Sequence, residues 1–213
     1  MPDLYYYPGN ASMTPHMLLQ ELGMPHRLVL VDRAVDAHKS AAYLALNPQG
    51  LLPTYVDGKL VLFETAAICL HLADTHPQAN LAPPLGTAAR ADFYRWLMYL
   101  TNTVQAEMII YFYPERLSDD AAMAERVKVH AEARLATMFD LLESTLQARG
   151  GPYFLGAHFS AIDPYLFMLS RWSRMMARPA RSRPALAAYL ARLAERPAVQ
   201  RVLAAEGIAA PYY

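Results

Sequence analysis

The segment Asn47–Ile68, NPQGLLPTYVDGKLVLFETAAI, decides the fold of this 213-residue chain. After a loop closed by a proline, Thr54–Val56 is a short apolar strand. The pair Asp57-Gly58 that follows is the strongest two-residue signal for a β-hairpin. Lys59–Phe63 returns as a second strand, and Glu64-Thr65 opens a helix. The segment therefore predicts a proline turn, a hairpin and a helix start in immediate succession.

Two peptide-binding features lie side by side in this segment. If the Leu52–Pro53 bond is cis, the turn presents the Leu52 backbone N–H and C=O outward, where an extended peptide can pair as an added strand. The helix that starts at Glu64-Thr65 offers free N–H groups and a positive dipole end, which suit a carboxylate. The Thr65 hydroxyl adds a donor, and the Glu64 side chain suits an ammonium group. The segment predicts a site for a small peptide with an amino group, a carboxylate and a mid-chain amide.

Composition excludes several classes of protein. Apolar residues make up 54% of the chain, enough for a full core, and 19 Lys and Arg balance 19 Asp and Glu. A net charge of zero argues against a nucleic-acid partner, because phosphate binding requires excess positive charge. We interpret the arginines between Arg171 and Arg183 as a solvated helix end.

The cysteine and histidine positions bear on redox chemistry and metal binding. The single cysteine, Cys69, excludes an intramolecular disulfide and a cysteine-based metal site, and the histidines show no metal-ligand spacing, so no metal is expected. One cysteine fits a reducing compartment. The N-terminus lacks the pattern of a signal peptide, and no apolar run reaches the roughly 18 to 20 residues of a membrane span. We therefore expect a cytoplasmic protein without a membrane segment.

Predicted strands and helices alternate in the first third of the chain, and the remainder is predicted to be helical. We expect strands at residues 3–7 and 27–31, helices at 12–22 and 64–74, and weak helical character over 36–46, before the hairpin. The proline-rich residues 77–87 indicate a linker. Helices are predicted over 88–111 and 119–149 and near Ser160, Pro184 and Pro197. At the first of these later helices, Ser160 and Asp163 form a predicted capping box, in which Ser160 accepts from the Asp163 N–H and the carboxylate reaches back.

Five segments resemble the glutathione S-transferases, most closely the bacterial beta class. They are YYYPGNASMTPHMLLQELG (5–23), NPQGLLP (47–53), ETAAICLHLAD (64–74), FSAIDPYLFMLSRW (159–172) and LAERPAVQRVLAAEG (193–207). The resemblance implies an α/β thioredoxin-like N-terminal domain over 1–76, the linker over 77–87, and an all-helical C-terminal domain over 88–213 that carries the electrophile pocket. It also implies a homodimer, with glutathione as cosubstrate, and attack of the glutathione thiolate on small apolar electrophiles.

One position departs from the beta-class pattern. The class reads roughly PGACS after its first strand, whereas this chain reads Pro8-Gly9-Asn10-Ala11-Ser12, so Ala11 replaces the class cysteine. Gln105-Ala106 stands where the class carries a His-Lys pair near the thiol. Redox chemistry that depends on the class cysteine is therefore not expected.

Three donors remain to stabilise a thiolate, which is needed because a free thiol is little ionised at neutral pH. Ser12 is the first choice, since it starts the first helix at the positive dipole end. Asn10 is the second, because its NH2 group donates without deprotonation. Tyr6 or Tyr7 is the third. The alternatives are structural: Ser12 as a plain helix cap, Asn10 as a turn residue and Tyr6 as a core residue.

The remaining expected contacts divide between the two substrates. Besides Leu52, Pro53, Glu64 and Thr65, the residues Lys39 and Gln49 are candidates for binding the glycine carboxylate of glutathione. For the electrophile, Met and aromatic side chains make an adaptable apolar wall. The candidates are Met108, Tyr111, Phe112, Tyr113, Trp172, Met175 and Met176, about half of which would be core residues instead.

Two other functions fit the same residues. One is glutathione-dependent peroxide reduction or dehalogenation at the same site. The other is a non-enzymatic binding protein, an alternative that the missing cysteine and the missing His-Lys pair leave open, although the intact Leu52-Pro53 and Glu64-Thr65 argue that glutathione binding persists.

Overall fold

The predicted hairpin forms half of a four-stranded sheet in the structure, a computed structural model that describes residues 1–213. The chain divides into two compact units, Met1–Ala82 with Ala194–Tyr212, and Pro83–Leu193 with Tyr213. None of the helices is both long enough and apolar enough to cross a bilayer.

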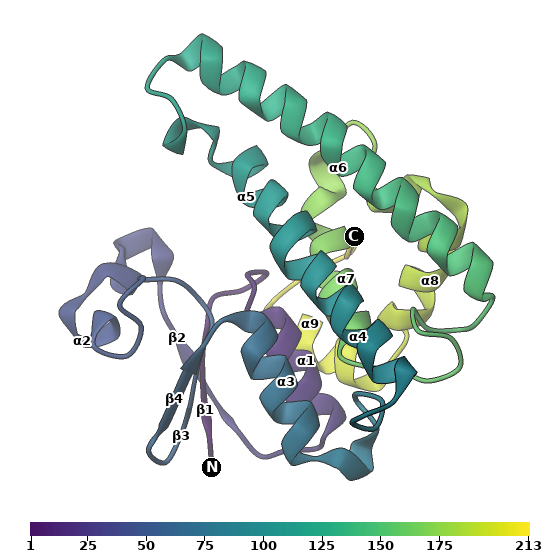
Figure 1. Cartoon of the computed structure of the whole chain (residues 1–213). Coiled ribbons are helices and arrows are strands. Elements are labelled where there is room, and N and C mark those ends of the chain that lie inside the picture. Colours follow the sequence, from purple (N-terminus) through teal and green to yellow (C-terminus); the bar gives the residue numbers. More distant parts are fainter. The chain divides into compact units, whose positions relative to one another are not determined.

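The first unit has the thioredoxin-like order that the sequence predicts. Its elements are β1 (Asp3–Tyr6), α1 (Met13–Glu21), β2 (Arg27–Leu30), α2 (Ala41–Leu44), β3 (Thr54–Asp57), β4 (Leu60–Phe63) and α3 (Thr65–Thr75). The strand order is β2-β1-β3-β4, with β1 parallel to β2 and antiparallel to β3, and with β3 antiparallel to β4. Helices α1 and α3 pack together on one face of the sheet (Figure 1).

The pairing register aligns three chain segments at one end of the sheet. Tyr5 pairs with Thr54, and Thr54 pairs with Phe63. One position further toward this end of the sheet, β1 continues to Tyr6, β3 is preceded by Pro53, and β4 is followed by Glu64. Since neighbouring strands lie about 4.8 Å apart, the end of β1, the proline turn and the start of α3 form a row about 10 Å wide.

The last helix, α9 (Pro197–Ala205), belongs to this first unit. The expected helical domain was residues 88–213, whereas the structure places 194–212 with the sheet. The physical reason is side-chain pairing with α1: the Arg196 guanidinium donates to both carboxylate oxygens of Glu21, at 2.7 and 2.8 Å, and Arg201 donates to Gln20 at 2.7 Å. These pairs join segments about 180 residues apart. Local sequence patterns do not reveal such contacts.

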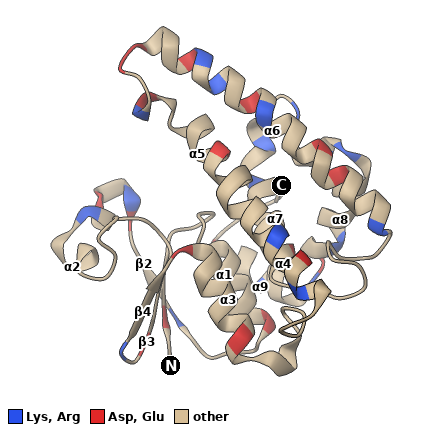
Figure 2. Cartoon of the chain, viewed as in Figure 1, with Lys and Arg blue, Asp and Glu red and all other residues tan.

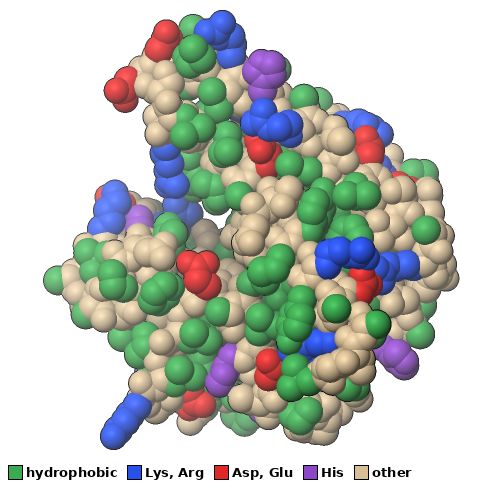
Figure 3. Space-filling model, viewed as in Figure 1, with side chains coloured by type: hydrophobic (Ala, Val, Ile, Leu, Met, Phe, Trp, Pro, Cys, Tyr) green, Lys and Arg blue, Asp and Glu red, His purple; other side chains and the backbone are tan.

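The second unit is helical, as predicted. Its helices are α4 (Ala88–Met98), α5 (Ala106–Phe112), α6 (Ala121–Arg149), α7 (Ile162–Trp172) and α8 (Pro184–Ala194). The single helix expected over 88–111 is interrupted by a seven-residue π-helix, Tyr99–Gln105. Cationic and anionic side chains both occur along α6 (Figure 2), and the face seen in Figure 3 shows both signs interspersed.

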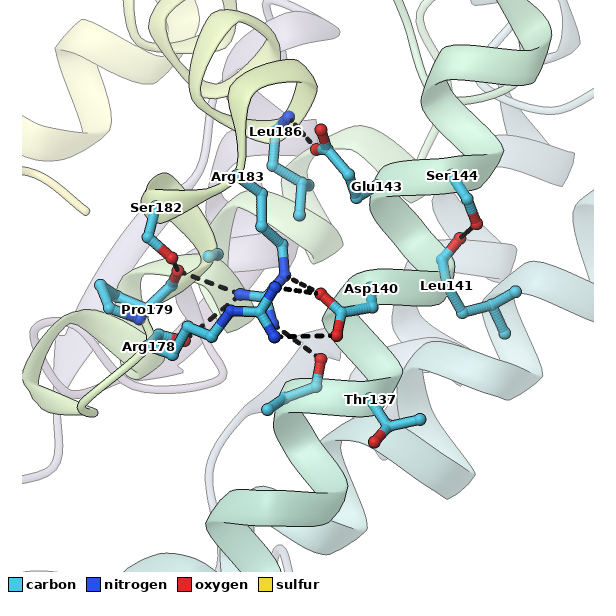
Figure 4. Close-up of polar contacts among 12 residues, drawn as sticks. Thr137, Asp140, Leu141, Glu143, Ser144, Arg178, Pro179, Ser182, Arg183 and Leu186 are labelled. Carbon is cyan, nitrogen blue, oxygen red and sulfur yellow. Dashed lines mark hydrogen bonds and ion pairs between the residues drawn. The ribbon is translucent and has the colours of Figure 1, made fainter.

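Acidic side chains of α6 hold the connection between α7 and α8 (Figure 4). The Arg183 guanidinium is 3% exposed and donates to Asp140 at 2.7 Å and to the Ala136 carbonyl at 2.7 Å. Glu143 accepts from the N–H groups of Ala185 and Leu186, at 2.9 and 2.7 Å, in the first turn of α8. Arg183, which the sequence suggested was solvated, is therefore a buried structural residue.

The capping box at α7 is present in altered form. The Asp163 carboxylate reaches back to the Ser160 N–H at 2.7 Å, as predicted. The Ser160 hydroxyl accepts from the Ile162 N–H at 3.3 Å instead of the Asp163 N–H. Asp163 also accepts from the Phe154 N–H at 2.9 Å and from the Tyr189 hydroxyl at 2.8 Å. Burial raises the pKa of Asp163 to about 6, against the opposing effect of these hydrogen bonds.

Replacing Asp163 tests this network. Asp163→Ala should lower the free energy of unfolding by about 3 kcal/mol, because it leaves buried N–H and hydroxyl donors unsatisfied. Urea unfolding followed by circular dichroism measures the change. Asp120→Ala is the matched control, since Asp120 caps the exposed start of α6, and should cost about 1 kcal/mol. Equal losses for the two variants would contradict a special role for Asp163.

Candidate functional site

The proline turn presents an unpaired backbone edge. The Leu52–Pro53 bond is cis. The Leu51 carbonyl accepts from the Tyr43 hydroxyl at 2.6 Å and from the Asn47 side-chain amide at 2.8 Å. Tyr43 and Asn47 are buried, so they hold the turn from inside. The N–H and C=O of the next residue, Leu52, have no partner within the protein, which leaves them available to an extended peptide.

The start of α3 combines backbone strain with unpaired polar groups. Glu64 has φ 72° and ψ 112°, a conformation that L-residues rarely adopt. Its side chain is exposed and has no hydrogen-bond partner. Thr65, the first helical residue, is 5% exposed. Such strain costs about 1–3 kcal/mol and is concentrated at functional sites, which supports a binding role for this helix start.

Ser12, the first choice for thiolate contact, is not free to make it in this geometry. It is fully buried, and its hydroxyl donates to the Tyr7 carbonyl at 3.2 Å and accepts from the Tyr7 N–H at 3.3 Å. Both directions of the hydroxyl are therefore used to close the loop between β1 and α1. The turn folds the hydroxyl back onto the strand end, and the contact of Ser12 with a thiolate stays a prediction.

Asn10 has a free donor in the same loop. Its Oδ1 atom accepts from the Ala11 N–H at 2.7 Å. The side-chain NH2 group has no protein partner, and the residue is partly exposed. Tyr6 is partly exposed too, and its ring makes an edge contact with His16 at 6.5 Å between centroids. Asn10 thus offers a donor that needs no deprotonation, at the start of α1.

Glu206, at the end of α9, holds this loop in place and was missed by sequence reasoning. Its carboxylate accepts from the Gly9 N–H at 2.8 Å and bonds His16 Nδ1 at 2.8 Å, and its side chain is fully buried. Gly9 has φ 69°, in the left-handed region that favours glycine. No local signal marks Glu206, because its partners lie 190 and 197 residues away.

The other expected glutathione ligands are exposed. The Lys39 ammonium pairs with Asp36 at 3.1 Å, and the Gln49 side chain is exposed beside the proline turn. Each is accessible to a carboxylate, although Lys39 already has an anionic neighbour.

The candidate electrophile residues of the second unit divide by burial. Met108 is fully buried and Tyr111 is 8% exposed, as core residues are. Phe112 is 41% exposed and makes an edge contact with the partly exposed Trp172 at 6.3 Å between centroids. Met175 is 81% exposed, whereas Met176 is buried. Tyr113 is partly exposed beneath the Arg116 guanidinium.

Cys69 does not compensate for the missing cysteine of the loop. It is fully buried inside α3, and burial raises the pKa of its thiol far above the ordinary value. A thiol that stays protonated and inaccessible supplies no nucleophile.

Comparisons with known proteins agree with this arrangement of sheet, turn and helices. Sequence models of the glutathione S-transferase N-terminal and C-terminal domains match residues 10–75 and 103–206. The chain belongs to the glutathione S-transferase family. It is 30% identical over 207 residues to the glutathione S-transferase GstA of Escherichia coli O157:H7, covering 96% of this chain and 98% of that protein.

Solved glutathione S-transferases share the fold over nearly the whole chain. A glutathione transferase homologue from Sulfitobacter, solved with bound glutathione, has a TM-score of 0.89 at 27% identity, covering 98% of this chain and 99% of that one. A beta-class glutathione S-transferase from Sphingomonas chungbukensis has a TM-score of 0.84 at 30% identity, covering 97% and 100%. The predicted resemblance to this family is confirmed.

Replacing Glu64 by glycine should separate the effect of its backbone strain on stability from the effect of its carboxylate on glutathione binding. Glu64→Gly should raise the free energy of unfolding by about 1 kcal/mol, because glycine adopts positive φ without strain. It should also weaken glutathione binding at least tenfold, since the carboxylate is lost. Urea unfolding and titration calorimetry measure the two effects. Glu64→Gln, which keeps the strain, should weaken binding without gaining stability. Unchanged affinity in both variants would show that Glu64 does not hold the ligand.

Removing the Glu206 carboxylate should loosen the loop between β1 and α1. Glu206→Ala should lower the free energy of unfolding by about 2–4 kcal/mol, because the half-buried Gly9 N–H and the buried His16 ring lose their hydrogen-bond partner. Glutathione affinity of the remaining folded protein should fall as well, which calorimetry measures at a temperature where the variant is folded. Glu195→Ala, an exposed acid in the same segment, is the control. Full affinity in the folded Glu206→Ala variant would restrict Glu206 to a stability role.

Proposed function

We propose that the protein conjugates the thiolate of glutathione to small apolar electrophiles, and that it activates the thiol without a cysteine. The observation that carries this proposal is the row formed by the loop after β1, the unpaired Leu52 backbone and the start of α3. A tripeptide in extended conformation is about 10 Å long, which matches the width of that row.

Each position along the row suits one part of glutathione. The cysteinyl amide pairs with the Leu52 N–H and C=O as an added strand. The γ-glutamyl carboxylate docks on the N–H groups and hydroxyl at Thr65, and Glu64 binds the neighbouring ammonium. Gln49 and Lys39 are the candidates for the glycine carboxylate. The thiol then lies toward the loop after β1.

The thiolate is stabilised by Asn10 together with the first turn of α1 in this proposal. The Asn10 NH2 group is unpaired, and its Oδ1 atom is fixed by Ala11, so the amide is already oriented. Donors that are in place before the reaction need no reorganisation when charge develops. Holding both reactants together supplies the remaining acceleration.

Three family expectations stay predictions. The electrophile is held by the apolar side chains of the second unit, with Phe112 and Trp172 the most accessible of the candidates. The protein forms a homodimer, to which exposed apolar side chains on α4 and α6, such as Tyr94, Met98 and Leu141, are suited. It resides in the cytoplasm.

Asparagine and serine variants test the thiol-activating residue. Asn10→Ala should raise the pKa of bound glutathione by about one unit, because a hydrogen bond to a charged group contributes about 1.5–3 kcal/mol and one unit corresponds to about 1.4 kcal/mol. Thiolate absorbance against pH measures the shift, and conjugation at neutral pH should slow about tenfold. Ser12→Ala should cost about 1 kcal/mol of stability and leave the thiol pKa unchanged. The reverse pattern would return the role to Ser12.

The same titrations distinguish the other functions. Absence of binding with millimolar glutathione would favour an interaction protein. Binding without turnover across a panel of electrophiles would favour a carrier, and turnover restricted to peroxides or organohalides would favour the peroxidase or dehalogenase alternative.

A further inference from the structure

Two histidine rings lie against each other in the first unit. His16 is in α1, and His26 lies directly before β2. Their ring centroids are 5.5 Å apart at an interplanar angle of 77°, and the Tyr6 ring at the end of β1 makes an edge contact with His16. The two histidines therefore connect α1, the end of β1 and the start of β2.

Hydrogen bonds determine which nitrogen of each ring carries a hydrogen. The His26 Nδ1 atom lies 2.7 Å from the Met24 carbonyl, which can only accept, so Nδ1 carries the hydrogen and Nε2 is the atom that takes a further proton. The His16 Nδ1 atom lies 2.8 Å from Glu206 Oε1, and the Gly9 N–H donates to the other oxygen of the same carboxylate at 2.8 Å. One carboxylate thus serves both His16 and the loop after β1.

The second nitrogen of His16 is buried without a partner. The side chains of His16 and Glu206 are both 0% exposed, and His16 Nε2 makes no hydrogen bond within the protein. A buried polar atom without a partner costs free energy, which is recovered when water reaches it. The contact of His16 with Glu206 is therefore easier to open than a fully satisfied one.

A proton on His26 adds a positive charge for which the cluster has no second carboxylate. Burial lowers the pKa of His26 below its ordinary value, the hydrogen bond to Met24 opposes this change, and positive charge on His16 lowers the pKa further. The closed arrangement of the two rings therefore resists protonation of His26.

The elements packed around the two histidines carry other charged or titratable groups, most of which have partners of their own. Helices α3 and α9 pack against α1. The groups are the ion pairs Glu21–Arg196 and Asp3–Arg27, Arg201 with its partner Gln20, Tyr6, and, on α3, Cys69, His71 and Asp74. The charge that acts on His26 is that of His16.

We propose that His26 is a pH-sensing residue, and that its protonation releases the loop after β1 from Glu206. In the opened state both rings are in water, and His26 takes a proton at the ordinary pKa of about 6.5. The closed state takes this proton only at lower pH, so it is fully favoured above about pH 6.5 and loses stability as the pH falls below that value.

Protons and glutathione then oppose each other at this loop. The loop carries Asn10, the proposed thiolate donor, directly after Gly9. Glutathione favours the closed loop, whereas protons favour the opened one, and by linkage each weakens the effect of the other. This step rests on the proposed function, but the release of Gly9 by acid does not.

Hydrogen exchange at the Gly9 amide measures the opening. Between about pH 7.5 and pH 5.5, its protection factor should fall about tenfold more in the wild-type protein than in His26→Asn, because one proton taken up on opening changes the equilibrium about tenfold per pH unit. Asparagine can still donate to the Met24 carbonyl and does not titrate. His26→Phe keeps a ring against His16 without a titrating nitrogen, and should behave like His26→Asn.

The control is His158→Asn, which replaces an exposed histidine of the second unit. It should keep the full pH dependence of the wild-type protein. Equal pH dependence of Gly9 protection in the wild-type protein and in both His26 variants would overturn the inference.

Added glutathione separates this inference from the proposed function. At about 100 times its dissociation constant, glutathione should raise Gly9 protection about hundredfold, since it binds the closed loop. Unchanged Gly9 protection at millimolar glutathione would contradict the proposed placement of the ligand. The pH dependence measured without glutathione would still decide the role of His26.

Discussion

The pairing register of β1, β3 and β4 is the constraint on which the candidate site depends. Tyr5, Thr54 and Phe63 share one row of the sheet. Because side chains in a strand alternate between faces, a slip of one residue would exchange the buried and exposed sets, so the core holds this register firmly. Tyr55 at 1% exposure and Leu4 at 0% are such core residues. The rigid register in turn brings the loop after β1, the Leu52 backbone and the strained Glu64 to one end of the sheet.

Buried side chains, two near the turn in sequence and one from the end of α9, then fix the polar groups at that end. Tyr43 and Asn47 hold the proline turn by binding the Leu51 carbonyl, and Glu206 holds the loop after β1 through Gly9. Each of these supporting side chains is buried and already satisfied. The groups left unpaired are those proposed to contact glutathione, namely the Leu52 backbone, the Glu64 carboxylate and the Asn10 amide. A site arranged in this way loses little entropy on binding, because its donors and acceptors are ordered beforehand.

Local sequence signals predicted the elements of the first unit well, since each has a short-range physical cause. Asp57-Gly58 favours a tight hairpin, and Glu64-Thr65 favours a helix start. The same reasoning ranked Ser12 above Asn10, because a serine at a helix start lies at the positive end of the dipole. It did not anticipate that the Ser12 hydroxyl turns back to Tyr7, since that contact depends on the path of the loop. The π-helix at Tyr99–Gln105 was also missed, because one extra residue per turn leaves no clear mark on an apolar pattern.

The sequence by itself determined the family, the thioredoxin-like order of elements, the proline turn and the absence of the beta-class cysteine at Ala11. These features follow from contiguous residues, whose identities and spacing act over a few positions. Only the tertiary structure decided which donor is free, that Glu206 and α9 support the loop after β1, and that the Tyr165 hydroxyl of α7 donates to Gln105, directly before α5. The free donor depends on how the loop after β1 folds back onto the strand end, and the other two outcomes depend on contacts between residues 60 to 197 positions apart. Packing of the whole chain brings such residues together, and no local pattern encodes it.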